Sequence, residues 1–169
     1  MKNKLLEETK VVTPFMPAEY VPDTYINGVA DGDAEAYDSI DGSNFRKAVL
    51  RLAFTEHQGG GTGQSVVLAL KCAAAEDDYA GAVAVKDDNG DNVSITKAAA
   101  AAAGVTEVEV NLDKQAGKHL FLVATVAGTG GTEYDPAESV FSAHVQLGDP
   151  IRLPVTASDA EVEGTPAED

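Results

Sequence analysis

Three histidines, His57, His119 and His144, carry the side chains best suited to proton transfer or zinc binding. None belongs to a His-x-His or His-Glu-x-x-His pattern, so their spacing does not favour a zinc site. A Ser–His–Asp triad stays open because its members need not be close in sequence, but no Gly-x-Ser-x-Gly elbow accompanies them. We expect surface or interface histidines, with His119 and His144 as neighbours if their strands pair. We therefore predict a protein that is not an enzyme.

Side chains with oxygen ligands occupy alternate positions at Asp87, Asn89 and Asp91, in the manner of a calcium-binding loop. The loop fails at its sixth position, where glycine is needed and Asn92 stands, and at its twelfth, where glutamate is needed and Ala98 stands. The Asn-Gly dipeptide inside the same run separates two short apolar segments, which is a strong signal for a hairpin turn. We predict a turn here, with no metal and no cofactor.

A glycine-rich loop at residues 58–63 separates two alternating apolar segments, 44–56 and 64–74. It lacks the Gly-Lys-Ser/Thr ending of a phosphate-binding loop, and no helical pattern follows it. The two flanking segments are therefore predicted to form a β-hairpin around a flexible tip. The single cysteine, Cys72, lies in the second segment and is expected to be buried and unreactive.

Residues 104–112 and 118–126 are predicted to be two strands joined by a polar turn, in which Gly117 is able to take a positive φ. The first strand alternates between apolar and polar residues, as expected of one buried and one wet face. The second is apolar on both faces, so it should be covered on both. This strand is expected in the middle of the fold or under a neighbouring subunit. The alanine run at 98–103 predicts one or two helical turns ending at Gly104.

These segments predict an all-β fold, an antiparallel β-sandwich or barrel-like domain over residues 25–155 with six to eight strands. The last long strand of this domain is expected at residues 139–147. A mobile acidic tail is expected at residues 156–169, because the segment is polar and carries no base.

Residues 1–24 are predicted to form an extended, proline-rich arm. Pro14, Pro17 and Pro22 are incompatible with a helix interior and with a central strand. Regularly spaced apolar side chains stand between the prolines and need a surface to contact. We expect either that the arm packs on its own domain or that it embraces a neighbouring subunit. The candidate contact residues of the arm are Val11, Val12, Phe15, Met16, Tyr20 and Val21.

The net charge of −16 is concentrated towards the two ends of the 169-residue chain. Residues 1–42 carry nine acids and three bases, and residues 155–169 carry five acids and no base. Such a balance argues against nucleic acids and anionic membrane surfaces as partners, because both require basic patches. It favours a partner with positive patches. No apolar run is long enough to predict a transmembrane helix.

Three segments resemble a family of small structural proteins of tailed bacteriophages, called capsid decoration, cement or minor head proteins. The first, EAYDSIDGSNFRKAVLRLAF, is an early strand after an acidic stretch, and the second, SVVLALKCAAAEDDY, is an alternating strand before an acidic patch. The third is the closing pair of strands, KHLFLVATVAGTGGTEYDPAESVFSAHVQLGDPIRLPV. Together they span residues 35–155, and none is a catalytic motif.

This resemblance implies a virion protein on the outer capsid surface that binds between major capsid subunits. It also implies self-association, with a homotrimer as the expected form. A head–tail connector or tail component is the alternative within virions. A host-surface carbohydrate-binding module is the alternative from another class, and it would require exposed aromatic residues such as Tyr79 and Tyr134.

Overall fold

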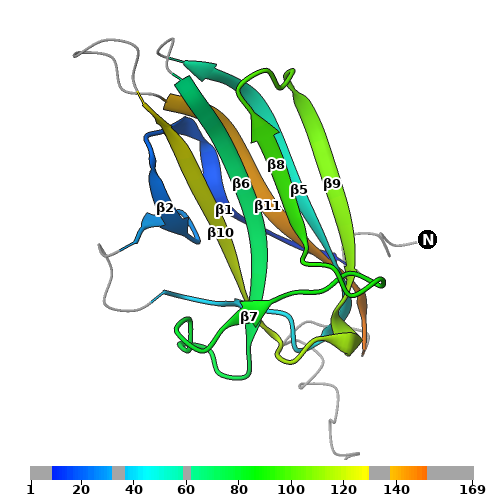
Figure 1. Ribbon diagram of the computed structural model, residues 1–169. Coiled ribbons are helices and arrows are strands. Elements are labelled where there is room, and N and C mark those ends of the chain that lie inside the picture. The colour runs from blue at the N-terminus through cyan, green and yellow to red at the C-terminus, as the bar shows by residue number, and fades with distance from the viewer. Residues whose placement is uncertain (1–8, 32–36, 59–61, 130–137, 152–169) are drawn as a thin grey trace, which may run out of the picture.

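Two antiparallel β-sheets pack face to face in the computed structural model, which describes residues 9–31, 37–58, 62–129 and 138–151 (Figure 1). The predicted all-β sandwich is therefore confirmed. The first sheet, sheet A, has the strand order β1-β11-β5-β9. Its strands are β1 (Thr9–Tyr20), β11 (Glu138–Pro150), β5 (Phe45–Gln58) and β9 (Gly104–Asn111).

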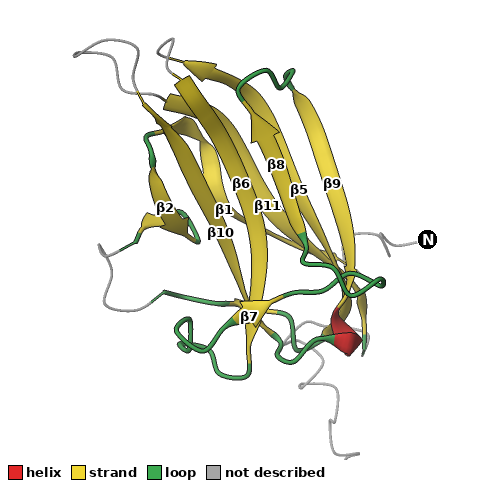
Figure 2. Cartoon of the chain, in the orientation of Figure 1, coloured by secondary structure: helices red, strands yellow, loops and turns green. Residues whose placement is uncertain are grey.

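The second sheet, sheet B, has the order β3-β2-β10-β6-β7, with β8 also paired to β6 and β4 also paired to β10. Its strands are β2 (Asp23–Ile26), β3 (Val29–Ala30), β4 (Ile40–Asp41), β6 (Thr62–Ala73), β7 (Val83–Ala84), β8 (Ser94–Ala98) and β10 (His119–Thr129). Figure 2 shows how strands dominate the described chain, with one 3-10 turn, η1 (Leu112–Lys114), following β9.

The main strands alternate between the two sheets along the chain, except that β6 and β8 both lie in sheet B. Taken in sequence, they are β1, β2, β5, β6, β8, β9, β10 and β11, and they form the four-strand sets β1-β11-β5-β9 and β2-β10-β6-β8. All of their pairings are antiparallel. This is the strand order of an eight-stranded jelly roll, in which two Greek keys close two sheets over one core.

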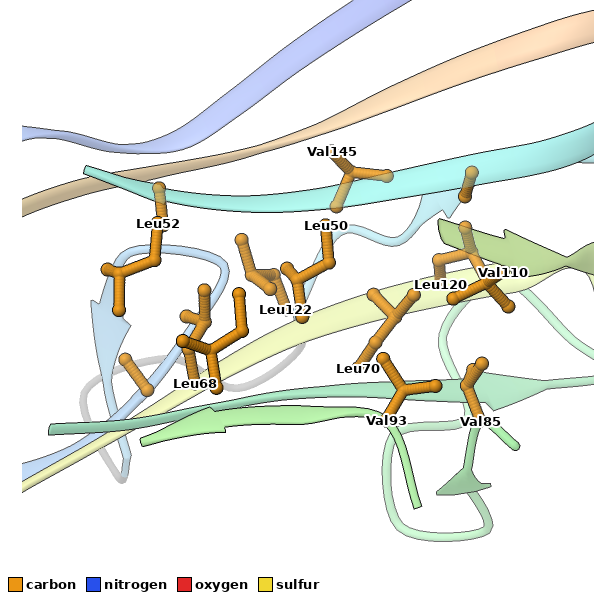
Figure 3. Close-up of a cluster of buried hydrophobic side chains, with 14 of the residues drawn as sticks. Leu50, Leu52, Leu68, Leu70, Val85, Val93, Val110, Leu120, Leu122 and Val145 are labelled. Carbon is orange, nitrogen blue, oxygen red and sulfur yellow. The ribbon is translucent and has the colours of Figure 1, made fainter. Parts of the chain in front are cut away.

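The core lies between the sheets and is built from alternate residues of each long strand, as Figure 3 shows for Leu50, Leu68 and Leu122. Every inward residue predicted for the strands at 44–56, 64–74 and 139–147 is buried. They are Ala48, Leu50, Leu52, Phe54, Val66, Leu68, Leu70, Cys72, Phe141, Ala143, Val145 and Leu147.

Strand β10 is covered on both faces, as its apolar sequence predicts. Leu120 and Leu122 face the main core, whereas Phe121 and Val123 form a second cluster with Ile26 on the outer face of sheet B. The partly buried side chains of Tyr37, Tyr79 and Ala82 pack against this second cluster. The cover therefore comes from the same chain rather than from a neighbouring subunit.

Both predicted hairpins between long strands are wrong. Strands β5 and β6 lie in different sheets, and so do β9 and β10, so each connection crosses from one sheet to the other. Alternation specifies which face of a strand is buried, but a buried face is equally possible in either sheet of a sandwich. Gly117 also has no positive φ. Its lack of a side chain matters because a Cβ there would overlap the backbone carbonyl of Ala73.

The alanine run does not form the predicted helical turns. It makes a tight turn from β8 to β9, in which the amide of Ala101 donates to the carbonyl of Ala98 at 2.8 Å. Helix nucleation is costly, so a run this short does not become helical between two strands that are both fixed in sheets. The predicted Asn-Gly turn is confirmed, with Gly90 at φ +88° and its amide 3.1 Å from the carbonyl oxygen of Asp87.

Candidate partner-binding edge

The described part of the predicted arm is an edge strand of the sandwich. Strand β1 pairs with β11 and shifts register twice, between Val12 and Phe15 and between Phe15 and Ala18. Pro14 and Pro17 lie within these shifts, where a missing backbone N–H breaks no regular ladder. Prolines exclude a central strand but permit an edge strand with bulges. The described part of the arm is therefore a strand of the sandwich rather than a segment outside it. Residues 1–8 lie outside the described residues.

Three of the six predicted contact residues of the arm face the protein's own core. Phe15 is fully buried, with its ring centroid 5.8 Å from that of Phe141. Tyr20 packs on the same ring at 4.5 Å, and its hydroxyl donates to the carbonyl of Met16 at 2.9 Å. Val12 is partly buried against the same core. Phe15 is fully buried and therefore packs on its own domain, which is one of the two expectations for the arm.

The other three predicted residues are exposed to solvent. Val11, Met16 and Val21 are 55%, 63% and 44% exposed, and Val29 of β3 is 41% exposed. The turn before Val29 reaches β1, since a Cβ at Gly28 would overlap the carbonyl oxygen of Pro14. We call Val11, Met16, Val21 and Val29 the β1-edge patch; Val11 and Met16 lie on the outer face of sheet A, and Val29 lies on the outer face of sheet B. It holds four of the seven large apolar side chains that are exposed in the described chain.

Sequence reasoning missed Val29, although the residues before it carry a usable signal. Asn27 and Gly28 both have positive φ, 48° and 87°, and they form the tight turn between β2 and β3. The side-chain oxygen of Asn27 accepts from the amide of Leu122 at 2.7 Å, and its backbone amide donates to the carbonyl of Leu122 at 2.8 Å. The Asn-Gly dipeptide thus predicts a hairpin. Its contacts with Leu122 fix the hairpin on β10, and Gly28 lies against Pro14 of β1.

His57 makes a partly buried polar bridge between strands. Its Nδ1 lies 2.8 Å from the hydroxyl of Ser139, and its Nε2 lies 3.2 Å from the carbonyl oxygen of Ala98. A carbonyl can only accept, so Nε2 donates to Ala98 and the hydroxyl of Ser139 donates to Nδ1. Ser139 is 1% exposed, so a substrate cannot reach its hydroxyl. The bridge joins β5 of sheet A to β8 of sheet B.

The other two histidines are not neighbours, because the strands that carry them lie in different sheets and do not pair. His119 lies in sheet B, 3.1 Å from the hydroxyl of Ser39, and His144 lies in sheet A, opposite Arg51. Burial lowers the pKa of His144, and the positive charge of Arg51 lowers it further. Among the described residues, no group of three or more His, Cys, Asp or Glu side chains is placed to hold a metal ion. No helix in that part of the chain is long and apolar enough to cross a membrane.

The fold and this edge define a jelly-roll sandwich with an exposed apolar border. No protein-family model matches the chain, and no curated protein matches it. Among solved structures, a chain from Desmodium yellow mottle tymovirus is similar over 88% of this chain and 89% of its own length, at 12% sequence identity and a TM-score of 0.31. A likeness at this level carries no inference about function, so the proposals below depend on this chain's own residues.

Proposed function

We propose that this protein is a structural virion protein that decorates and stabilises the outer surface of a tailed-phage capsid by binding between major capsid subunits. The proposal rests on the resemblance of residues 35–155 to decoration proteins and on a jelly-roll fold, which is frequent in capsid and lectin domains. Fold alone does not define function, so the attachment surface must carry the argument. The role needs neither catalysis nor a cofactor.

The β1-edge patch is the observation that carries the proposal. Exposed apolar side chains that gather along one border of a sandwich are typical of a protein–protein contact. The prolines and register shifts of β1 hinder the addition of another strand there. A partner would therefore contact side chains such as those of Val11 and Met16, on the outer face of sheet A, rather than the backbone. Each Å² of apolar surface buried in that contact contributes roughly 25 cal/mol to the free energy of binding. The contributions of many copies on one shell add together.

The charge of the chain supports the same role. A net charge of −16 would repel packaged nucleic acid and other virions, and it would attract positive patches on a shell subunit. Association with such patches would be fast and would weaken as salt concentration rises. Major capsid subunits and further copies of this chain, as a homotrimer, are the partners we propose.

The carbohydrate-binding alternative receives no support from Tyr79. Its ring lies 5.5 Å from that of Phe121 and 5.3 Å from that of Tyr37, and the ammonium group of Lys71 lies 4.8 Å from its centroid. A sugar platform needs a free ring face, whereas this ring is engaged in the second cluster. Tyr134 lies outside the described residues.

Copy number per purified particle tests the proposal and separates it from the connector alternative. Quantitative mass spectrometry would compare this chain with the major capsid protein of the same particles. We expect hundreds of copies in a simple ratio to the capsid subunit, removable by protease treatment of intact particles. A dozen copies or fewer would instead indicate a connector or tail component. Absence from mature particles, or protection inside the shell, would overturn the outer-surface role.

Substitution of Met16 by aspartate tests the attachment surface. We expect Met16→Asp to reduce binding to capsids lacking this protein by at least about tenfold, because a carboxylate replaces an apolar contact. Val83→Asp is the matched control, since Val83 is 52% exposed but lies in β7, away from this patch. Co-sedimentation with the particles measures both. Equal loss in the two variants, or no loss in Met16→Asp, would contradict attachment through this edge.

A further inference from the structure

Strand β9 is an open sheet edge. It ends sheet A on the side opposite β1, and in the described chain its outer side pairs with no other strand. The strand runs for eight residues, Gly104–Asn111, without a proline and without a register shift against β5. Its outward N–H and C=O groups are therefore available to pair with another strand.

The remaining sheet edges in the described chain are protected or short. Strand β1 carries Pro14, Pro17 and two register shifts. At the borders of sheet B, β3 and β7 have two residues each and β8 has five. Proteins usually blunt long edges in such ways, so an eight-residue edge left open indicates an interaction surface.

The outer face of β9 presents a defined row of side chains. Val105 is 54% exposed, and Glu107 and Glu109 follow it at the same strand face. Glu107 pairs with Arg51 at 3.0 Å, and Glu109 pairs with Lys47 at 2.6 Å, so both carboxylates are held in place along the edge. From the start of the strand, this row therefore consists of one apolar side chain followed by two acidic side chains.

Two copies of β9 do not match each other. An antiparallel pairing that keeps the buried faces on one side would bring Glu107 and Glu109 of one copy opposite or diagonal to the same residues of the other. Like charges facing each other across a sheet are destabilising. The edge instead fits an extended segment with two bases at alternate positions followed by an apolar residue.

We propose that residues 2–6 of a second copy of this chain pair with β9 as an added antiparallel strand. Every second residue of this segment matches the required order of two bases followed by an apolar residue: Lys2, Lys4 and Leu6. In antiparallel register, Lys2 is opposite Glu109, Lys4 is opposite Glu107 and Leu6 is opposite Val105.

The inward side of this register is also compatible. Leu5 is then opposite Thr106, and Asn3 is opposite Val108, which is partly buried against the main core. The pairing thus places an apolar side chain on each face of the added strand.

The segment must come from another copy, because its own β9 is out of reach. Its chain continues into β1 at Thr9, and a strand beyond β9 lies four strand spacings from β1, about 19 Å. Thr9 is three residue steps along the chain from Leu6, and three extended steps span at most about 11 Å. Donor and acceptor surfaces differ, so the contact is head-to-tail and closes into a ring when the rotation between copies permits. The inference does not require a virion role.

Charge reversal tests the proposal in the full-length purified chain by sedimentation equilibrium. We expect the wild type to self-associate and Lys2→Glu/Lys4→Glu to raise the dissociation constant by about tenfold. Adding Glu107→Lys/Glu109→Lys to that variant should restore association to within about threefold of the wild type. Circular dichroism would establish that each variant is folded. A wild type that stays monomeric at about 100 µM, above the dissociation constants expected of a specific oligomer, would overturn the proposal.

Cross-linking provides a second measurement that does not depend on the charge variants. Lys4→Cys/Glu107→Cys with a short bismaleimide reagent should join different copies, since directly opposite side chains lie about 5 Å apart at Cβ. Mixing isotopically labelled and unlabelled chains would show that the linked peptides come from different copies. The control Lys4→Cys/Glu19→Cys places the second thiol on the exposed β1 edge, and native Cys72 is buried. Equal yields in the two variants, or links within one chain, would contradict pairing at β9.

Discussion

His57 illustrates how a side chain suited to chemistry can serve stability instead. Its two ring nitrogens satisfy the buried hydroxyl of Ser139 and the carbonyl of Ala98, which come from different sheets. A buried hydroxyl left without a partner costs about 1–3 kcal/mol, so the histidine contributes chiefly by preventing that loss. The same pair of residues on an accessible surface would have the geometry of a base and its nucleophile.

Replacing His57 by phenylalanine is expected to lower the free energy of unfolding by about 1–3 kcal/mol, because the hydroxyl of Ser139 loses its acceptor. Urea titration followed by circular dichroism measures the change. The double variant His57→Phe/Ser139→Ala should recover part of the loss, since no buried hydroxyl remains unpaired. A loss equal to the sum of the two single variants would contradict a direct bond between the residues.

His144 is expected to make the fold less stable in mild acid. Burial and Arg51 lower its pKa below the ordinary value of 6.5, so the folded chain binds this proton more weakly than the unfolded chain. The free energy of unfolding therefore falls as the pH drops below about 6.5 towards the lowered pKa, and this contribution is constant above 6.5. His144→Gln should show a smaller drop in melting temperature between pH 7.5 and 5.5 than the wild type. Identical drops would exclude this source of acid sensitivity.

At the scale of elements, the buried face of each strand could be predicted from the sequence, but the strand with which it pairs could not. The alternation around Leu50, Leu68 and Val145 correctly predicts which residues are buried. Nothing in that alternation distinguishes a strand in sheet A from a strand in sheet B, so β5–β6 and β9–β10 were mistaken for hairpins. Val11, Met16 and Val21 were predicted as contact residues from the apolar spacing of the arm, but Val29 was not. The burial of Phe15 depends on the pairing of β1 with β11, which places Phe15 opposite Ala143.

Strand β10 supports a prediction that belongs to this scale, because it is covered on both faces by its own chain. Phe121→Ala should lower the free energy of unfolding by about 3–5 kcal/mol, and Leu122→Ala by about 2–5 kcal/mol, since each opens a cavity. Both losses should be the same at low and high protein concentration. A loss from Phe121→Ala that grows with concentration would mean that a second copy, not Tyr37 and Tyr79, covers that face.

At the scale of the whole molecule, crossings between the sheets make the sandwich one cooperative unit. Apart from the short strands β3, β4 and β7, consecutive strands mostly lie in different sheets, so neither sheet has an independent stretch of chain. Residues 1–42 and 155–169 hold most of the net charge of −16. The first of these segments also carries β1 to β4 and the core residues Phe15, Ile26 and Ile40, so part of the charge lies on the packed sandwich itself.

A single unfolding transition is the expected consequence of this arrangement. Urea titrations followed by far-ultraviolet circular dichroism, which reports strands, and by near-ultraviolet circular dichroism, which reports the packed tyrosines, should share one midpoint. Separate midpoints would show that one sheet persists without the other.

The pairing of β1 with β11 brings Thr9–Tyr20 against Glu138–Pro150, so the first described strand meets a partner from the far end of the fold. During synthesis, the chain emerges from the ribosome at roughly 5–20 residues per second, so β11 is made several seconds after β1. Throughout that delay the apolar side chains of Phe15 and Met16 have no β11 to pack beside. Rapid translation or temporary cover by a chaperone would therefore raise the yield of folded protein, and a pause before residue 138 would lower it.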